Sequence, residues 1–349
     1  MEESGWQRFE QRIIAEKSDG QFYGLNTVQK IVDELFYQKH LSVVHTDAAT
    51  DQITITAEHV PDALGEVPDA RPALEQLDDL VGIDAIRERL MEVVAQIEVA
   101  GADKALRPSL HMRFVGGPGT GKTTIARILG QLMKERGLLS KGQFFEYAGR
   151  DFCGQYIGET APKTAAMCRD AYGSVLFIDE AYSLYRGDKD NRDYGREAID
   201  TLIAQMENHR QDFVVIMAGY EEDMDTMMTG NAGLASRMPY TVTFPNYDRE
   251  ALFQIFMKMA GRSFAYEPEL EQTVKSYFDA LSDEVLKGKD FANARFVRNL
   301  FERTWGKASV RRQLEPDAPF CLCVCDFDKA AADREFQELQ QKKSRRIGF

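Results

Sequence analysis

The stretch GGPGTGKTT at residues 116–124 has the residue types and spacing of a phosphate-binding loop. From Gly116 to Thr123 it fits the pattern G-x-x-x-x-G-K-[ST], and an apolar run, LHMRFV, comes directly before it. Glycines let the backbone turn so tightly that successive N–H groups point at phosphate oxygens, and the start of the next helix adds favourable positive potential. The stretch therefore predicts that this chain binds a nucleotide.

Within this loop the lysine and the first threonine have separate tasks. We expect Lys122 to reach the terminal phosphates and Thr123 to offer its hydroxyl to Mg²⁺. A plain glycine-rich turn is the simpler alternative, but such a turn has no need of a lysine–threonine pair. The remaining contacts to the cofactor are expected from Gly117, Pro118, Gly119, Thr120, Gly121 and Thr124.

A pair of neighbouring carboxylates, Asp179 and Glu180, follows the apolar run at residues 175–178. Open α/β sheets bind their ligands at the carboxyl ends of such strands. Asp179 is expected to hold Mg²⁺ through its waters, and Glu180 to orient and deprotonate the attacking water. An acidic helix start is the alternative, but the phosphate loop earlier in the chain favours catalysis.

The elements that must position these groups can be read from the apolar runs. Five of them are short and separated by helical patterns, which indicates an α/β fold with a parallel, doubly wound sheet. After Asn246 the pattern is helical to about residue 313, which indicates a small helical lid. The apolar side chains after the phosphate loop recur at helical spacing. The runs are HMRFVG, QFFEYAG, SVLFID, FVVIMAG and YTVTFP, and the helical side chains are Ile125, Ile128, Leu129 and Leu132.

Composition limits the possible classes of partner. The chain has 349 residues, of which 44% are hydrophobic, and a formal net charge of -13. An acidic surface repels nucleic acid and anionic lipid, so neither a nucleic-acid partner nor a membrane is expected. The start MEESGWQRFEQ is unlike a signal peptide, and we expect a cytoplasmic protein. The basic cluster at residues 342–346 is interpreted as a solvated chain end.

Three of the five cysteines, Cys321, Cys323 and Cys325, alternate in FCLCVC. On a strand this spacing would put the three thiols on one face. A zinc site usually needs a C-x-x-C pair and a second pair of ligands, and neither is present. Free thiols on a strand in a reducing compartment are therefore expected, with metal or redox chemistry as the alternative.

From about Leu77 to Ala330 the chain resembles the AAA+ ATPases. Within them it is similar to the group that contains CbbX, the red-type Rubisco activase, and stage V sporulation protein K. The resemblance implies a P-loop ATPase core followed by a helical lid, with ATP and Mg²⁺ as cofactors. The segments that carry it are LDDLVGIDAIRERL, GQYIGETAPKT, VLFIDEAYSL, DYGREAIDTLIAQMEN, VVIMAGYEEDM, GLASRMPYTVTFPNY and NARFVRNLFE.

The resemblance also implies roles for particular residues outside the phosphate loop. Val81 and Gly82 would line the adenine pocket, Arg295 would be the arginine of the lid that senses the nucleotide, and Arg237 would reach the nucleotide of a neighbouring subunit. The first pore loop, which grips a polypeptide in the centre of a ring, would consist of Tyr156, Ile157 and Gly158.

Each of these roles has an alternative. Tyr156 could be a buried aromatic, Arg237 a surface ion-pair partner and Arg295 a salt-bridge partner at a helix start. Many AAA+ proteins also end the fourth strand with an asparagine that senses the γ-phosphate, but this chain has MAGYE at residues 217–221. Tyr220 could supply a hydroxyl there, and we assign no residue to that task.

The predicted function is ATP hydrolysis by a ring-forming motor, a hexamer of this chain, that remodels a protein client through its central pore. The competing interpretation is a scaffold or switch that binds ATP to fix an oligomer and threads nothing. A nucleic-acid motor is disfavoured by the acidic charge. The client itself is not identified: Rubisco, a sporulation partner and a secretion substrate are all compatible with this core.

The first 66 residues contain a segment that repeats the pattern of the lid. In GLNTVQKIVDELF the apolar spacing matches that of the helix after Asn293, and an alternating stretch follows each, ITITAEHVPDA and CLCVCDFDKA. The two copies are offset by about 268 residues, and similarity at a fixed offset indicates a repeat. The matching side chains are Val28, Ile31, Val32 and Phe36 in the first copy and Val297, Leu300, Phe301 and Trp305 in the second.

This repeat predicts that residues 1–66 are the lid of a preceding AAA+ module and that the chain is a piece of a tandem protein. Asn26 stands where the second copy has Arg295, so the preceding module would be a weak or inactive ATPase. An unrelated adaptor domain is the alternative. The expected domains are residues 1–66, the α/β domain 67–246, the lid 247–331 and a basic helix or tail 332–349.

Overall fold

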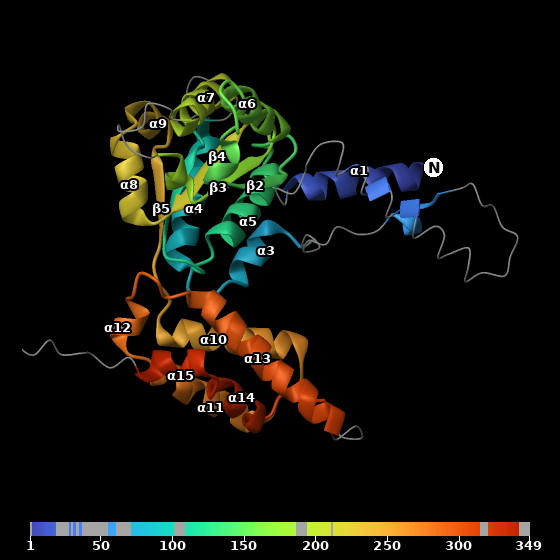
Figure 1. Ribbon diagram of the computed structural model, residues 1–349, viewed down its shortest axis with the longest axis vertical. Helices are drawn as coiled ribbons and strands as arrows, with labels where there is room; N and C mark the ends of the chain where they lie inside the picture. The colour runs from blue at the N-terminus through green and yellow to red at the C-terminus, as the bar shows by residue number, and fades with distance from the viewer. Residues whose placement is uncertain are drawn as a thin grey trace, which may run out of the picture.

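The computed structural model describes residues 2–18, 28, 31–32, 35–36, 55–60, 71–100, 109–185, 194–210, 212–314 and 320–341. An α/β domain is followed by an all-helical lid, and the first helix lies to the side of the α/β domain (Figure 1). Asn26 and the basic cluster at residues 342–346 lie outside the described residues. None of the described helices combines the length and the hydropathy that crossing a bilayer requires.

The α/β domain is built on a parallel sheet of five strands in the order β2-β3-β4-β1-β5. Each of the five apolar runs that were expected to build the sheet forms a strand, so the predicted fold class is confirmed. The strands are β1 (Met112–Gly116), β2 (Phe144–Ala148), β3 (Val175–Asp179), β4 (Val214–Gly219) and β5 (Tyr240–Phe244).

Side chains alternate between the two faces of this sheet, as strand geometry requires. In β3, Val175 and Phe177 join the apolar cluster on one face, whereas Leu176 and Ile178 join the cluster on the other. Helices cover both faces, which explains why the strands are continuously apolar. One face carries α3 (Ala73–Asp78), α4 (Asp84–Ala100) and α5 (Lys122–Glu135); the other carries α6 (Thr160–Asp170), α7 (Tyr194–Asn208), α8 (Glu221–Thr229) and α9 (Ala232–Arg237).

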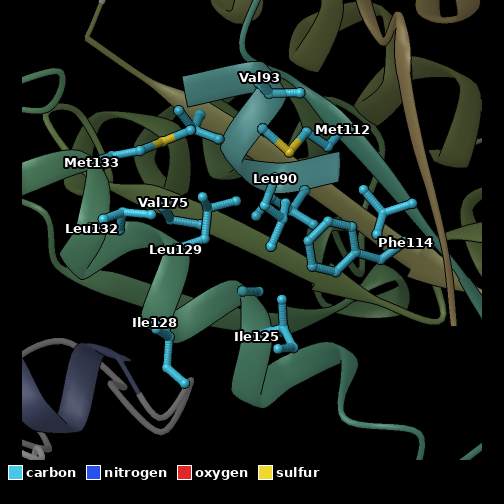
Figure 2. Packing of buried hydrophobic residues seen from close by; sticks show 14 of the residues in the cluster. Leu90, Val93, Met112, Phe114, Ile125, Ile128, Leu129, Leu132, Met133 and Val175 are labelled. Atoms are coloured by element: carbon cyan, nitrogen blue, oxygen red, sulfur yellow. The ribbon is translucent and has the colours of Figure 1, made fainter. Parts of the chain in front are cut away.

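Helix α5 is fixed to the sheet by the apolar stripe that its sequence predicts. Ile125, Leu129 and Leu132 are fully buried, and Ile128 is 6% exposed. Figure 2 shows Ile125 and Leu129 on the side of α5 that faces Leu90 of α4 and Phe114 of β1, in the apolar cluster that also contains Val93 and Met112. Burial of each such side chain contributes about 1.5–3 kcal/mol. The start of α5, and with it the phosphate loop, is therefore held firmly against the sheet.

The lid is a helical unit around one aromatic core. Phe256 of α10 lies with its ring centroid 6.4, 5.9 and 5.4 Å from those of Phe278, Phe301 and Phe327. Phe336, near the start of the last helix, is 1% exposed in the same core. The predicted helical lid is thus confirmed. Its helices are α10 (Arg249–Ser263), α11 (Pro268–Asp279), α12 (Asp283–Leu286), α13 (Asn293–Leu314), α14 (Val324–Ala331) and α15 (Arg334–Gln341).

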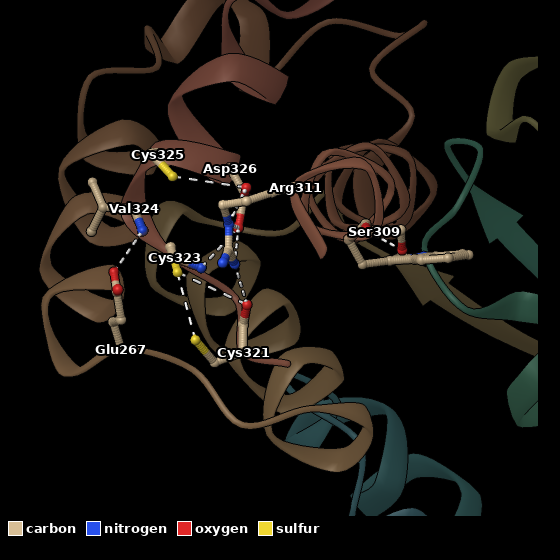
Figure 3. Close-up of polar contacts among 9 residues, drawn as sticks. Glu267, Ser309, Arg311, Cys321, Cys323, Val324, Cys325 and Asp326 are labelled. Atoms are coloured by element: carbon tan, nitrogen blue, oxygen red, sulfur yellow. Dashed lines mark hydrogen bonds and ion pairs between the residues drawn. The ribbon is translucent and has the colours of Figure 1, made fainter. Parts of the chain in front are cut away.

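The expected strand at FCLCVC was wrong. Only Leu322 pairs, in an isolated bridge to Tyr266, and Cys323 is already the N-cap of α14. The Asp326 carboxylate accepts the Cys323 N–H at 3.1 Å and starts the helix (Figure 3). A helix cap therefore overrides the alternating pattern, and the three thiols do not share a face: Cys321 is half-buried, Cys323 buried and Cys325 exposed.

The described N-terminal residues consist of α1 (Glu3–Ser18), helical residues between 28 and 36, and the short 3-10 helix η1 (Ala57–His59). Helix α1 packs against η1 and lies beside β2, the edge strand of the sheet (Figure 1). In the stretch expected to be an alternating strand, the described residues 55–60 contain no strand.

A buried histidine, His111, lies directly before β1. His111 is 1% exposed, its Nδ1 accepts the Val215 N–H at 3.0 Å and its Nε2 lies 3.3 Å from the Met206 carbonyl. Burial lowers the pKa of His111 to about 4, and Arg210 and Arg237 lower it further, against the raising effect of the Met206 carbonyl. The imidazole is therefore neutral in the folded protein near pH 7.

Stability should fall on acidification because of this residue. The unfolded chain binds a proton on His111 near pH 6.5, whereas the folded chain does so only near pH 4. Its contribution is thus complete above pH 6.5 and is lost toward pH 4, with a loss of about 2 kcal/mol by pH 5. Urea unfolding at pH 7 and pH 5 measures the change. His111→Gln is the matched control and should show a smaller loss; an equal loss in both proteins would contradict the assignment.

Candidate active site

The phosphate loop joins the end of β1 to the start of α5, and its backbone can be made only with glycine at two points. Gly119 has a φ of +69°, and a Cβ there would lie 2.1 Å from the Ala292 carbonyl oxygen. A Cβ on Gly116 would lie 2.3 Å from the carbonyl oxygen of Phe244. The loop is therefore a bare backbone cradle wedged between β5 and the lid, which fits a phosphate chain bound by N–H groups.

Lys122 is directed into this cradle. Its Nζ donates to the carbonyl oxygens of Gly116 and Gly117 at 3.0 and 2.6 Å. Burial lowers the pKa of Lys122, the Asp179 carboxylate raises it, and the Arg295 guanidinium lowers it. The start of α13 also lies against the loop, because a Cβ on Gly119 would be 3.0 Å from the backbone nitrogen of Arg295.

The two carboxylates at the end of β3 differ in geometry. Asp179 is half-buried and its Oδ1 accepts the Glu180 N–H at 2.9 Å. Glu180 is exposed and adopts a left-handed conformation, with φ 47° and ψ 41°. Such a conformation costs a non-glycine residue on the order of 1–3 kcal/mol and is typical of functional sites. The turn separates the two side chains, so one can serve the metal and the other a water.

Two tyrosines extend this end of the sheet. The rings of Tyr182 and Tyr220 lie 6.1 Å apart, and Tyr220 is the N-cap of α8. Burial raises the pKa of Tyr182, and the charges of Glu180 and Tyr220 raise it further. Sequence reasoning missed Tyr182; its position two residues after Glu180 was the available signal.

The expected adenine side of the site lies where the α/β domain meets the lid. Val81 and Gly82 form the bend between α3 and α4, and a Cβ on Gly82 would lie 3.3 Å from the ring of Tyr247. The Tyr247 hydroxyl donates to the Thr120 carbonyl of the phosphate loop at 3.3 Å. Tyr247 thus connects the two predicted nucleotide-binding segments, and it was not recognised in the sequence.

Asn293 was also missed, and it joins the loop to the lid. It is fully buried, with a left-handed φ of 47°. Its Nδ2 lies 3.1 Å from the Pro118 carbonyl and 2.9 Å from Asn246 Oδ1, and its Oδ1 accepts the Tyr247 N–H at 2.9 Å. The next residue, Ala294, donates its N–H to the Gly119 carbonyl at 3.0 Å. We call these contacts the Asn293 junction.

Arg237 lies at the opposite end of the sheet from the phosphate loop. The Ser109 hydroxyl, just before β1, donates to the Arg237 carbonyl at 2.7 Å, whereas the loop begins at the far end of β1. β1 has five residues, so the Cα atoms at its two ends are about 13 Å apart. The Arg237 Nε lies 3.2 Å from Glu207 Oε2, so the predicted alternative of an ion pair is observed.

The predicted pore loop is exposed and held in shape by a carboxylate. Tyr156 is 68% and Ile157 81% exposed, which excludes the alternative of a buried aromatic. Oε2 of Glu159 accepts the N–H groups of Gln155 and Tyr156, each at 3.1 Å. Gly158, also exposed, completes the turn. An aromatic and an aliphatic side chain therefore project from a pre-shaped loop.

Two groups of side chains could hold a metal ion. Thr123, half-buried at the start of α5, and Asp179 offer the hard oxygen ligands that Mg²⁺ prefers, next to the phosphate cradle. In the described part of the lid, Glu267, Cys321 and Cys323 also lie close enough to share an ion. Glu267 Oε2 already accepts the Val324 N–H at 3.1 Å, and the two sulfur atoms are 3.6 Å apart.

Family models match both units of the chain. The model described as "ATPase family associated with various cellular activities (AAA)" matches residues 112–246, and the AAA lid domain model matches residues 248–337. The lid model thus extends into α15, in agreement with the packing of Phe336 in the lid core.

Curated relatives cover most of the chain. Protein CbbX of Cereibacter sphaeroides is 41% identical over 267 residues, which are 74% of this chain and 83% of that protein. The chloroplastic ribulose bisphosphate carboxylase/oxygenase activase of Cyanidioschyzon merolae is 42% identical over 66% of this chain and 79% of that protein. Stage V sporulation protein K of Bacillus subtilis is 40% identical over 68% and 74%.

A solved structure supports the fold. The AAA domain of FIGL-1 in complex with ADP superposes with a TM-score of 0.52, at 17% identity, covering 74% of this chain and 87% of that chain.

The Asn293 junction can be tested with two substitutions. Asn293→Gly keeps the left-handed backbone and removes the amide, so it should weaken binding of a fluorescent ADP analogue roughly tenfold through loss of about one to two hydrogen bonds. Asn293→Ala should bind as weakly and also lower the free energy of unfolding by a further ~1–2 kcal/mol, because of backbone strain. Wild-type affinity in Asn293→Gly would show that the junction does not position the nucleotide site.

Proposed function

Since this chain belongs to the AAA+ ATPases, in the group of CbbX and stage V sporulation protein K, we propose that it is a Mg²⁺-dependent motor. It assembles as a ring, a hexamer of this chain, and remodels a protein client through the central pore. The observation that carries the proposal is the bare backbone cradle at Gly116 and Gly119, into which Lys122 donates at 3.0 and 2.6 Å, while Tyr156 and Ile157 stand exposed elsewhere on the same domain.

The chain's own residues divide the work of hydrolysis. The cradle and Lys122 bind the phosphates, and Thr123 with Asp179 would hold Mg²⁺, which supplies charge neutralisation on the phosphates when bound. Glu180, exposed beyond the metal ligand, orients the attacking water and takes its proton. Arg295, close to Lys122, adds positive charge from the lid side. A change in the conformation of the phosphate loop is then passed to the lid through the hydrogen bonds of the Asn293 junction.

The position of Arg237 supports the proposal of a ring. Because it is attached at the far end of β1 from the phosphate loop, it is poorly placed for the nucleotide of its own subunit. It can instead be presented to the nucleotide of a neighbour, where an arginine stabilises the charge that develops in the transition state. Its pairing with Glu207 holds the side chain at the subunit surface until the neighbour arrives.

The client is proposed to be a polypeptide. Exposed aromatic and aliphatic side chains on a rigid turn can press on successive residues of an extended chain without reading its sequence. The relatives' names point to ribulose bisphosphate carboxylase/oxygenase for one of them and to sporulation for another. Rubisco, a sporulation partner or a secretion substrate would each fit a grip of this kind.

The action of Arg237 across subunits can be tested by mixing variants. Arg237→Ala and Glu180→Gln should each bind ATP and hydrolyse it at least ~10³-fold more slowly than the unmodified protein. Mixed together, they should regain ATPase activity, because some sites then combine an intact Glu180 with an intact Arg237 of the neighbour. The control is the double variant mixed with Arg237→Ala, which has no such site. A mixture as inactive as its components would contradict a role in trans.

The grip of the pore loop can be tested with an unfolded polypeptide, for which casein is the probe. We expect casein to stimulate ATP hydrolysis by the unmodified chain and by Tyr156→Phe, which keeps the ring. Tyr156→Ala should lose the stimulation, because the alanine cannot press on the polypeptide. If casein stimulates all three proteins equally, Tyr156 is not the grip; if it stimulates none, the ATP-dependent scaffold becomes the better interpretation.

A further inference from the structure

Three side chains of metal-binding types meet within the lid. Glu267 is the N-cap of α11, Cys323 is the N-cap of α14, and Cys321 lies two residues before Cys323. The two sulfur atoms are 3.6 Å apart, and one ligand atom from each of the three residues lies within 4.8 Å of the other two (Figure 3). Two connections of the lid, one before α11 and one before α14, therefore supply a single cluster of possible ligands.

These separations fit three corners of a tetrahedral metal site. Two thiolate sulfur atoms at about 2.3 Å from a tetrahedral Zn²⁺ ion are about 3.8 Å from each other, and a sulfur and a carboxylate oxygen are about 3.6 Å apart. The sulfur atoms of Cys321 and Cys323 are already close to the first of these distances. Glu267 Oε2 accepts the Val324 N–H at 3.1 Å, and a carboxylate has further lone pairs that can bind an ion while this hydrogen bond is kept.

Backbone hydrogen bonds hold the two connections together. The Glu267 N–H donates to the Leu322 carbonyl at 3.0 Å, and the Leu322 N–H donates to the Ala265 carbonyl at 2.9 Å. Leu322, between the two cysteines, is fully buried in the lid core. The ligands are therefore attached to a backbone that is already in place, which reduces the cost of ordering them when an ion binds.

A buried ion pair also holds the backbone of the two cysteines. The fully buried Asp326 carboxylate accepts the Cys323 N–H at 3.1 Å. Arg311 Nη2 donates to the same carboxylate at 2.9 Å and to the Cys321 carbonyl at 2.7 Å (Figure 3). Hydrogen bonds of this kind around a metal site orient its ligands and increase its affinity. Since Asp326 balances the charge of Arg311, the negative charge of Glu267 and of two thiolates remains available to a cation.

The ligand types indicate which ion fits. Thiolates favour Zn²⁺ and Cu(I), whereas a carboxylate favours harder ions such as Mg²⁺ and Ca²⁺. Two sulfur ligands with one oxygen ligand suit Zn²⁺, which binds cysteine, histidine and carboxylate side chains in tetrahedral sites.

A disulfide between Cys321 and Cys323 fits the geometry less well. Leu322 lies between them in an extended bridge to Tyr266, and Cα atoms two residues apart in extended chain are about 6.6 Å from each other. That separation is near the upper end of the range that disulfides span. Binding of an ion leaves the backbone as it is, whereas a disulfide would require the two cysteines to approach each other.

We propose that Glu267, Cys321 and Cys323 bind one Zn²⁺ ion, with water at the fourth position. Glu267 and Cys321 are half-buried, so solvent reaches the cluster. Cys325 is not a ligand, because its sulfur lies by Asp326, 3.8 Å from Oδ1 (Figure 3). The bound ion would fasten the connection before α11 to the connection before α14 and so stabilise the lid. The inference does not depend on the proposed motor activity.

The site can be tested with Co²⁺, which replaces Zn²⁺ in tetrahedral sites and absorbs strongly when thiolates bind it. The reduced, nucleotide-free chain is titrated with Co²⁺ and then with Zn²⁺. We expect thiolate-to-metal absorption that saturates at one ion per chain and disappears when Zn²⁺ displaces Co²⁺. Cys321→Ser, Cys323→Ser and Glu267→Gln should each bind at least tenfold more weakly, whereas the matched control Cys325→Ser should bind like the unmodified chain.

Three outcomes of this titration overturn the proposal. The first is the absence of thiolate-to-metal absorption in the unmodified chain. The second is unchanged binding in any of the three ligand variants. The third is a loss of binding in Cys325→Ser as large as that in Cys321→Ser, because the ion would then be held by a different set of thiols.

A second measurement uses the unmodified chain and does not depend on the folding of variants. The reduced protein is treated with iodoacetamide with and without Zn²⁺, and the alkylation of each cysteine is followed by peptide mass spectrometry. Zn²⁺ should slow the alkylation of Cys321 at least tenfold, because a metal-bound thiolate is a poor nucleophile, and should leave the exposed Cys325 unchanged. Equal rates at Cys321 with and without Zn²⁺, or equal protection of both cysteines, overturns the proposal.

Discussion

The buried amide of Asn293 is the contact on which the arrangement of the site depends. Asn293 has a left-handed backbone conformation. Its side chain forms hydrogen bonds with Pro118 in the phosphate loop and with Asn246 and Tyr247, which lie between β5 and α10. One side chain at the start of the lid helix α13 therefore contacts both the phosphate loop and the segment between β5 and α10. Because a buried amide is costly to leave unpaired, a change in any of the three must be followed by the others. This constraint couples the phosphate loop to the lid.

The rigid part of the site is the sheet with its two apolar layers. Because the side chains of β3 pack into both apolar layers, Asp179 and Glu180 have a fixed position at the carboxyl end of this strand. The buried apolar side chains of α5 likewise fix the position of Lys122 at the start of that helix. The exposed groups, Tyr156 with Ile157 and Arg237, are attached to the same rigid domain but point away from the cradle. The cradle and the two carboxylates are thus held by one packed domain, separate from the lid.

Local patterns in the sequence determined the phosphate loop, the carboxylate pair, all five strands and the helical lid, because each depends on residues that are consecutive or one helical turn apart. The tertiary structure alone revealed the Asn293 junction, whose bond to Pro118 spans 175 residues, and the place of Arg237 at the far end of β1. It also showed that Asp326 turns the alternating cysteines into a helix cap. Polar contacts between distant segments leave no periodic pattern, so only the folded chain could show them.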